Sequence, residues 1–131
     1  MRGREHMNEQ SRREQSIIDN YHAQQQKSDR ELELLQKKQR SLAEKEESIF
    51  MFKQQVAALV AEEKELHSSA DEMREIWGLE EELHENFKDV ERDCENQHEA
   101  LQIETKQLYD KEELRTEQYY KAIQSVNEEE R

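Results

Sequence analysis

The chain has 131 residues, no proline and only two glycines, and 40% of its residues are charged against 32% that are apolar. Sheets and barrels need turns built from glycine and proline, and an enzyme core needs more apolar material than this. A net charge of −13 has the wrong sign for binding nucleic acid or an anionic membrane surface. This composition leaves long helices, a coiled coil or disorder.

The negative charge is concentrated in the second half of the chain. Residues 1–66 carry 12 basic and 13 acidic side chains, whereas residues 67–131 carry 8 and 20. Such an asymmetry suits two helices that lie side by side, or an acidic face that meets a basic partner.

The beginning of the chain has neither an apolar signal-peptide core nor a membrane-spanning stretch. We expect residues 1–6 (MRGREH) to be foreign to the native chain, because Met7 is a suitable start. The expected location is the cytoplasm, with any co-export through a secretion system depending on a signal other than a signal peptide.

Residues 7–31 are mostly polar and predict a weakly anchored beginning of a first helix. Residues 32–66 predict the core of that helix, because apolar residues recur at the heptad spacing of a coiled coil. The positions of this row are Leu35, Leu42, Ile49 and Val56.

The row changes phase near Ile49. Phe52 and Leu59 each lie three residues after a member of the row, which indicates a slip in the heptad pattern. This slip falls in the most apolar segment of the chain, residues 49–60 (IFMFKQQVAALV).

Residues 67–79 are the predicted turn region. Ser69 and Glu72 have the spacing of a capping box, which marks the beginning of a helix. Gly78 favours a turn or a helix end, because glycine inside a helix costs about 1 kcal/mol relative to alanine. The reversal therefore lies at residues 67–69 or 77–79.

A second helix is expected over residues 80–126, followed by a frayed tail at residues 127–131. Its apolar residues form a heptad row, a companion row that begins in the turn region, and a C-terminal extension. These are, respectively, Phe87, Cys94, Leu101 and Leu108; Ile76, Leu83 and Val90; and Tyr119, Ile123 and Val126.

The predicted fold is all-α: a long antiparallel two-helix hairpin of coiled-coil type. A two-helix hairpin buries little surface per residue, so we expect self-association as a homodimer, or a helical partner, to complete a bundle. Polar residues interrupt both predicted rows, at Gln25, Ser28, Gln39 and Glu46 in the first and at Gln97, Glu104 and Lys111 in the second.

Two Glu-x-x-His pairs have the spacing of ligands in di-iron bundles, Glu81/His84 and Glu95/His98. They lie 14 residues apart on one predicted helix, about 21 Å at 1.5 Å per residue, so they cannot converge on one metal ion. The lone Cys94 belongs to an apolar row, which favours a small buried side chain over a reactive thiol. We expect no catalytic residue, metal or cofactor.

The only tryptophan, Trp77, stands beside Gly78, where the chain is expected to reverse. It either stabilises the turn or anchors a partner. The predicted partner-binding residues are Ile49, Phe52, Val56, Leu59, Trp77, Gly78 and Phe87.

An acidic helical hairpin with Trp-Gly at its turn resembles the WXG-type proteins of type VII secretion, although this chain lacks the residue that separates Trp from Gly in that motif. Residues 78–120 (GLEEELHENFKDVERDCENQHEALQIETKQLYDKEELRTEQYY) are similar to the second arm of small helical proteins encoded beside LXG toxins of Gram-positive bacteria.

That resemblance implies a protein that binds the helical N-terminal domain of an LXG toxin together with a second small helical protein, and presents the toxin for export. It also implies that Tyr109 and Glu113 match a Tyr-x-x-x-Asp/Glu export motif. Two alternatives stay open at this point: a coiled-coil stalk or escort protein of a type III or flagellar export ATPase, and a structural coiled-coil scaffold.

Overall fold

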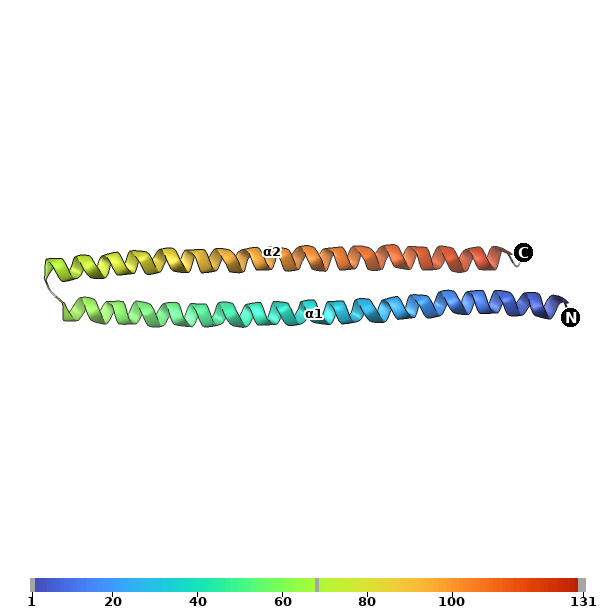
Figure 1. Ribbon diagram of the computed structural model, residues 1–131, viewed down its shortest axis with the longest axis horizontal. Coiled ribbons are helices and arrows are strands. Elements are labelled where there is room, and N and C mark those ends of the chain that lie inside the picture. Colours follow the sequence, from blue (N-terminus) through green and yellow to red (C-terminus); the bar gives the residue numbers. More distant parts are fainter. Residues whose placement is uncertain (1, 68, 130–131) are drawn as a thin grey trace. The chain divides into compact units, whose positions relative to one another are not determined.

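The computed structural model describes residues 2–67 and 69–129, with side chains from residue 9 onward. Two α-helices account for nearly all of it: α1 (Arg2–Leu66) and α2 (Ala70–Glu129). The helices pack against each other as a hairpin, with α2 antiparallel to α1 (Figure 1). The predicted all-α hairpin is therefore confirmed. Among the described residues, no helix has a stretch both long and apolar enough to cross a membrane.

The chain reverses at the first of the two predicted sites. The Glu72 N–H donates to the Ser69 side-chain oxygen at 3.2 Å, and the Met73 N–H donates to the Ser69 carbonyl at 3.0 Å. Ser69 is therefore the N-cap of α2, as the capping-box spacing predicts. Asp71 and Glu72 in the first turn of α2 add negative charge at the positive end of the helix dipole.

The alternative reversal at residues 77–79 is wrong, and so is the predicted start of the second helix at residue 80. Gly78 lies inside α2, and no described glycine has a positive φ. The helical cost of one glycine is small beside the packing of both flanking turns, so the helix continues through it. At the other end α2 extends through Glu129, beyond the predicted end at residue 126; residues 130–131 lie outside the described part.

The chain forms two compact units, each with a segment of both helices: unit 1 (Met1–Gln36 with Ile103–Arg131) and unit 2 (Lys37–Gln102). In unit 2 the buried apolar side chains are Leu42, Cys94 and Leu101. Leu42 and Leu101 line the same hollow between the helices, so the two heptad rows meet in this part of the hairpin. Cys94 is a buried free thiol that packs as a small apolar residue.

Unit 1 has a more polar interior. The rings of Tyr21 and Tyr119 stack with centroids 4.2 Å apart. Ser28 is only 2% exposed, and its hydroxyl accepts a hydrogen bond of 2.6 Å from the Arg115 guanidinium. These contacts hold the beginning of α1 against α2, although the polar composition of residues 7–31 predicts a weakly anchored segment.

Candidate functional site

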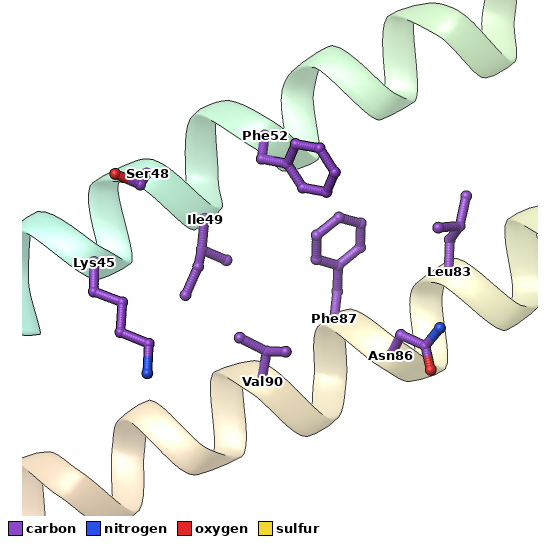
Figure 2. A pocket seen from close by; sticks show the side chains of 8 residues that line it. All are labelled: Lys45, Ser48, Ile49, Phe52, Leu83, Asn86, Phe87 and Val90. Atoms are coloured by element: carbon purple, nitrogen blue, oxygen red, sulfur yellow. The ribbon is translucent and has the colours of Figure 1, made fainter.

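An open apolar groove of about 450 Å³ lies between α1 and α2 in unit 2. Figure 2 shows Ile49 and Phe52 on α1 pointing toward Phe87 and Val90 on α2. The Phe52 and Phe87 rings meet edge to face, with centroids 6.0 Å apart, a favourable aromatic geometry. Ile49 and Phe87 are half-buried, whereas Phe52 is 57% exposed. The two helices therefore leave much of this apolar surface open.

Helix periodicity extends the groove toward the turn. Leu59 lies seven residues after Phe52, and Ile76 lies seven before Leu83, which also lines the groove. In an α-helix a seven-residue step returns to the same side with a drift of about 20°. We call this surface the apolar face, formed by Ile49, Phe52 and Leu59 of α1 and Ile76, Leu83, Phe87 and Val90 of α2.

The apolar face also explains the phase slip seen in the sequence. Past Ile49 the partly buried positions of α1 are Lys53, Val56, Val60 and Lys64, so the interior row continues at three- and four-residue steps. Phe52 and Leu59 are instead exposed members of a second row on one side of α1. The apolar residues of α1 therefore form two rows here, one buried against α2 and one exposed on the apolar face. The pairing of the helices does not slip.

Ion pairs bridge the opposite side of unit 2. The Lys53 Nζ lies 2.9 Å from the Glu91 Oε1, and the His98 Nε2 contacts the Glu46 Oε1. We call this side the ion-paired face. Phe50 lines the hollow on this side and is 59% exposed, slightly more than Phe52 at 57%. The two faces of the hairpin therefore differ in chemistry.

The structure does not bring all the predicted partner-binding residues together. Trp77 is 54% exposed. It lies fourteen residues before Glu91, and the seven-residue periodicity of the helix places it on the side of the ion-paired face. Gly78 is exposed and has no atom within 4 Å of where a Cβ would lie. Val56 is partly buried between the helices.

The two residues of the predicted export motif lie one helical turn apart on α2 in unit 1. Tyr109 is 51% exposed, and Glu113 is exposed as well. Because residues four apart share a helix surface, both side chains are open to a binding protein.

Among the described residues, no cluster of three or more histidine, cysteine, aspartate or glutamate side chains could hold a metal ion. His98, from one of the two Glu-x-x-His pairs, contacts Glu46 of α1. The acidic composition of α2 accounts for the spacing of these pairs without a metal.

One titratable group near the turn is perturbed. His67 Nδ1 lies 2.9 Å from the Glu72 carboxylate, and His67 Nε2 lies 3.0 Å from the Glu63 carboxylate. The hydrogen bond with Glu72, followed by the charges of both carboxylates, raises the pKa of His67 above its usual value. Protonated His67 therefore links the last turn of α1 to the first turn of α2.

No protein-family model, curated protein or solved structure matches the chain. Sequence reasoning found the apolar residues of the site but missed their division between two faces. The seven-residue spacing of Phe52 with Leu59 and of Ile76 with Leu83 was the available signal.

Proposed function

We propose that the protein is a non-enzymatic helical adaptor that binds the N-terminal helical domain of an LXG toxin and presents it for type VII secretion. The apolar face is the observation that supports binding. Its open groove has the shape that accepts the apolar row of another helix, and burial of that row would provide the affinity.

A thin hairpin gains from such a partner. Phe52, Leu59 and Leu79 are each more than half exposed in unit 2, and exposed apolar side chains of this size commonly mark interaction sites. A helix laid over the groove would complete a three-helix layer, and a second small helical protein would extend it to a bundle. The adaptor acts in the cytoplasm in this proposal, before the toxin is exported.

The export motif gives the proposal a second part. Tyr109 and Glu113 lie in unit 1, whereas the apolar face lies in unit 2. We propose that the apolar face binds the toxin while Tyr109 and Glu113 contribute to the signal that the export machinery reads. Tyr109→Ala would then reduce toxin export and leave toxin binding unchanged.

The proposal is tested by titration calorimetry of the full chain against the purified N-terminal domain of an LXG toxin encoded beside it, paired with an export assay in the native host. We expect saturable binding, and loss of toxin export when the gene is deleted. Absence of binding, or equal export from the deletion strain, would refute the proposed function.

A further inference from the structure

The charge of unit 2 is divided unequally between its helices. Residues 37–66 of α1 carry 6 basic and 6 acidic side chains, whereas residues 70–102 of α2 carry 3 and 12, a net charge of −9. A partner that lies in the groove contacts both segments, so one of its flanks meets a neutral helix and the other an acidic one.

The negative charge reaches the edge of the groove. Asn86 lines the groove, and Glu82 and Asp89 lie four residues before and three residues after it, on the same side of α2. Glu75 lies seven residues before Glu82 and continues the row. All three acidic side chains are exposed. We call Glu75, Glu82 and Asp89 the acidic rim.

The α1 edge of the groove has no such row. Beside Phe52 it carries Ser48, Met51 and Gln55, which are uncharged. Ser48 lines the groove itself, and so does Lys45, the one charged side chain that α1 contributes to the lining (Figure 2). The groove therefore has an acidic edge on α2 and an α1 edge that carries Lys45 but no acidic row, with an apolar floor between them.

We propose that the apolar face takes a basic amphipathic helix: one with an apolar row at 3-4 spacing and a row of lysine or arginine on the flank that meets the acidic rim. This inference rests on the proposed function and specifies the chemistry of its partner. Opposite charges along the edge set the register and raise the association rate, while the apolar row supplies most of the affinity.

A second copy of the chain fits the groove less well. Two copies facing each other would bring two segments of net charge −9 into one bundle. The like charges would oppose that packing, whereas a basic helix would neutralise the rim.

The test uses the full chain and two synthetic helical peptides of about 21 residues, long enough at 1.5 Å per residue to cover the groove from Ile76 to Val90. Both peptides carry the same leucine row, with lysines along one flank in the first and glutamates in the second. We expect the lysine peptide to bind at least about tenfold more tightly in low salt, and the difference to shrink as salt is added.

Two triple variants localise the effect. Neutralising the acidic rim by Glu75→Gln, Glu82→Gln and Asp89→Asn should weaken lysine-peptide binding by about fivefold or more. The matched control, Glu81→Gln, Glu85→Gln and Glu99→Gln, removes the same charge from the side of α2 that faces away from the groove, and should leave the affinity unchanged. Phe52→Ala should weaken binding of both peptides.

Equal affinity for the two peptides, or equal loss in both triple variants, would overturn the inference. So would a stable dimer in sedimentation that Phe52→Ala dissociates, because a second copy would then cover the face. If the toxin domain binds through Phe52 but shows no dependence on the acidic rim, this inference alone fails. If the lysine peptide binds as expected and the toxin domain does not, the proposed function alone fails.

Discussion

Gly78 is a residue whose replacement should stabilise the protein. It lies inside α2 with helical backbone geometry, and a Cβ at this position would meet nothing within 4 Å. Gly78→Ala should therefore raise the free energy of unfolding by about 0.5–1 kcal/mol, because alanine loses less backbone entropy in a helix. Urea unfolding followed by circular dichroism measures this. The reverse control is Ala58→Gly, at an exposed helical position of α1, which should lower the free energy of unfolding.

His67 should make the turn sensitive to pH. Its pKa is raised in the folded chain by Glu72 and Glu63, above the value of 6.5 for a free histidine. Its stabilising contribution is therefore complete below about pH 6.5, the unfolded pKa, and is lost as the pH rises through the higher folded pKa. An NMR titration of the His67 ring should show the raised pKa, and Glu72→Gln should lower it. An unchanged pKa in that variant would contradict the assigned cause.

At the scale of the helices, the Ser69 cap defines where α2 begins. Its side chain accepts the Glu72 N–H, one of the donors that a helix start leaves without a partner. Ser69→Ala should destabilise the protein by about 1 kcal/mol, whereas Ser69→Asp should retain the cap. Thermal unfolding of the two variants separates them; equal stability of Ser69→Ala and wild type would mean that the cap contributes nothing.

The contact between Ser28 and Arg115 should hold the two helix segments of unit 1 in register. The buried Ser28 hydroxyl accepts one hydrogen bond from the guanidinium, and the Gln24 carbonyl accepts another at 3.2 Å. Arg115→Ala should cost about 1–2 kcal/mol, because the buried Ser28 hydroxyl loses its hydrogen-bond partner. A double-mutant cycle with Ser28→Ala should give a coupling energy above about 0.5 kcal/mol. A coupling near zero would show that the pair is independent.

Helix type and cap were predictable because each depends on local spacing, and the antiparallel pairing was predictable because a short turn joins two apolar rows. Leu42 lies opposite Leu101 as the heptad rows require, and Ser69 caps α2 as its spacing to Glu72 requires. The polar residues predicted to interrupt the buried row of α2 were wrong by one position. Gln97, Glu104 and Lys111 are exposed, whereas His98, Thr105 and Glu112 are partly buried. Beside a row of residues seven apart, the companion row can lie either three or four residues further along the chain. Packing against the neighbouring helix determines which of the two is buried.

The candidate site was harder to predict for the same reason. Phe50, Phe52 and Trp77 are all exposed, and sequence spacing on one helix does not show which residues of the other helix share their side. Pairing α1 with α2 separates them, with Phe52 on the apolar face and Phe50 lining the ion-paired face. A function that depends on one face therefore becomes visible only when both helices are placed.

For the whole molecule, the two units have different interiors and different proposed roles. In unit 1, polar contacts join the two helices, such as the ion pair in which the Arg13 Nη1 lies 2.7 Å from the Glu129 Oε2. Unit 1 also carries the exposed Tyr109. Unit 2 carries the apolar face and the acidic rim. We expect variants of the apolar face to alter partner affinity without loss of helicity, because Phe52 is more exposed than buried.

The central claim is that the partner binds the apolar face and leaves the ion-paired face free. The most direct measurement compares Phe52→Ala with Phe50→Ala by titration calorimetry against the toxin's N-terminal domain, with circular dichroism as the folding control. The two phenylalanines are 57% and 59% exposed and differ in the face that they line. We predict that Phe52→Ala weakens binding by more than about tenfold, about 1.4 kcal/mol or more, while Phe50→Ala binds like wild type. Equal affinities of the two variants, or a larger loss in Phe50→Ala, would contradict the claim.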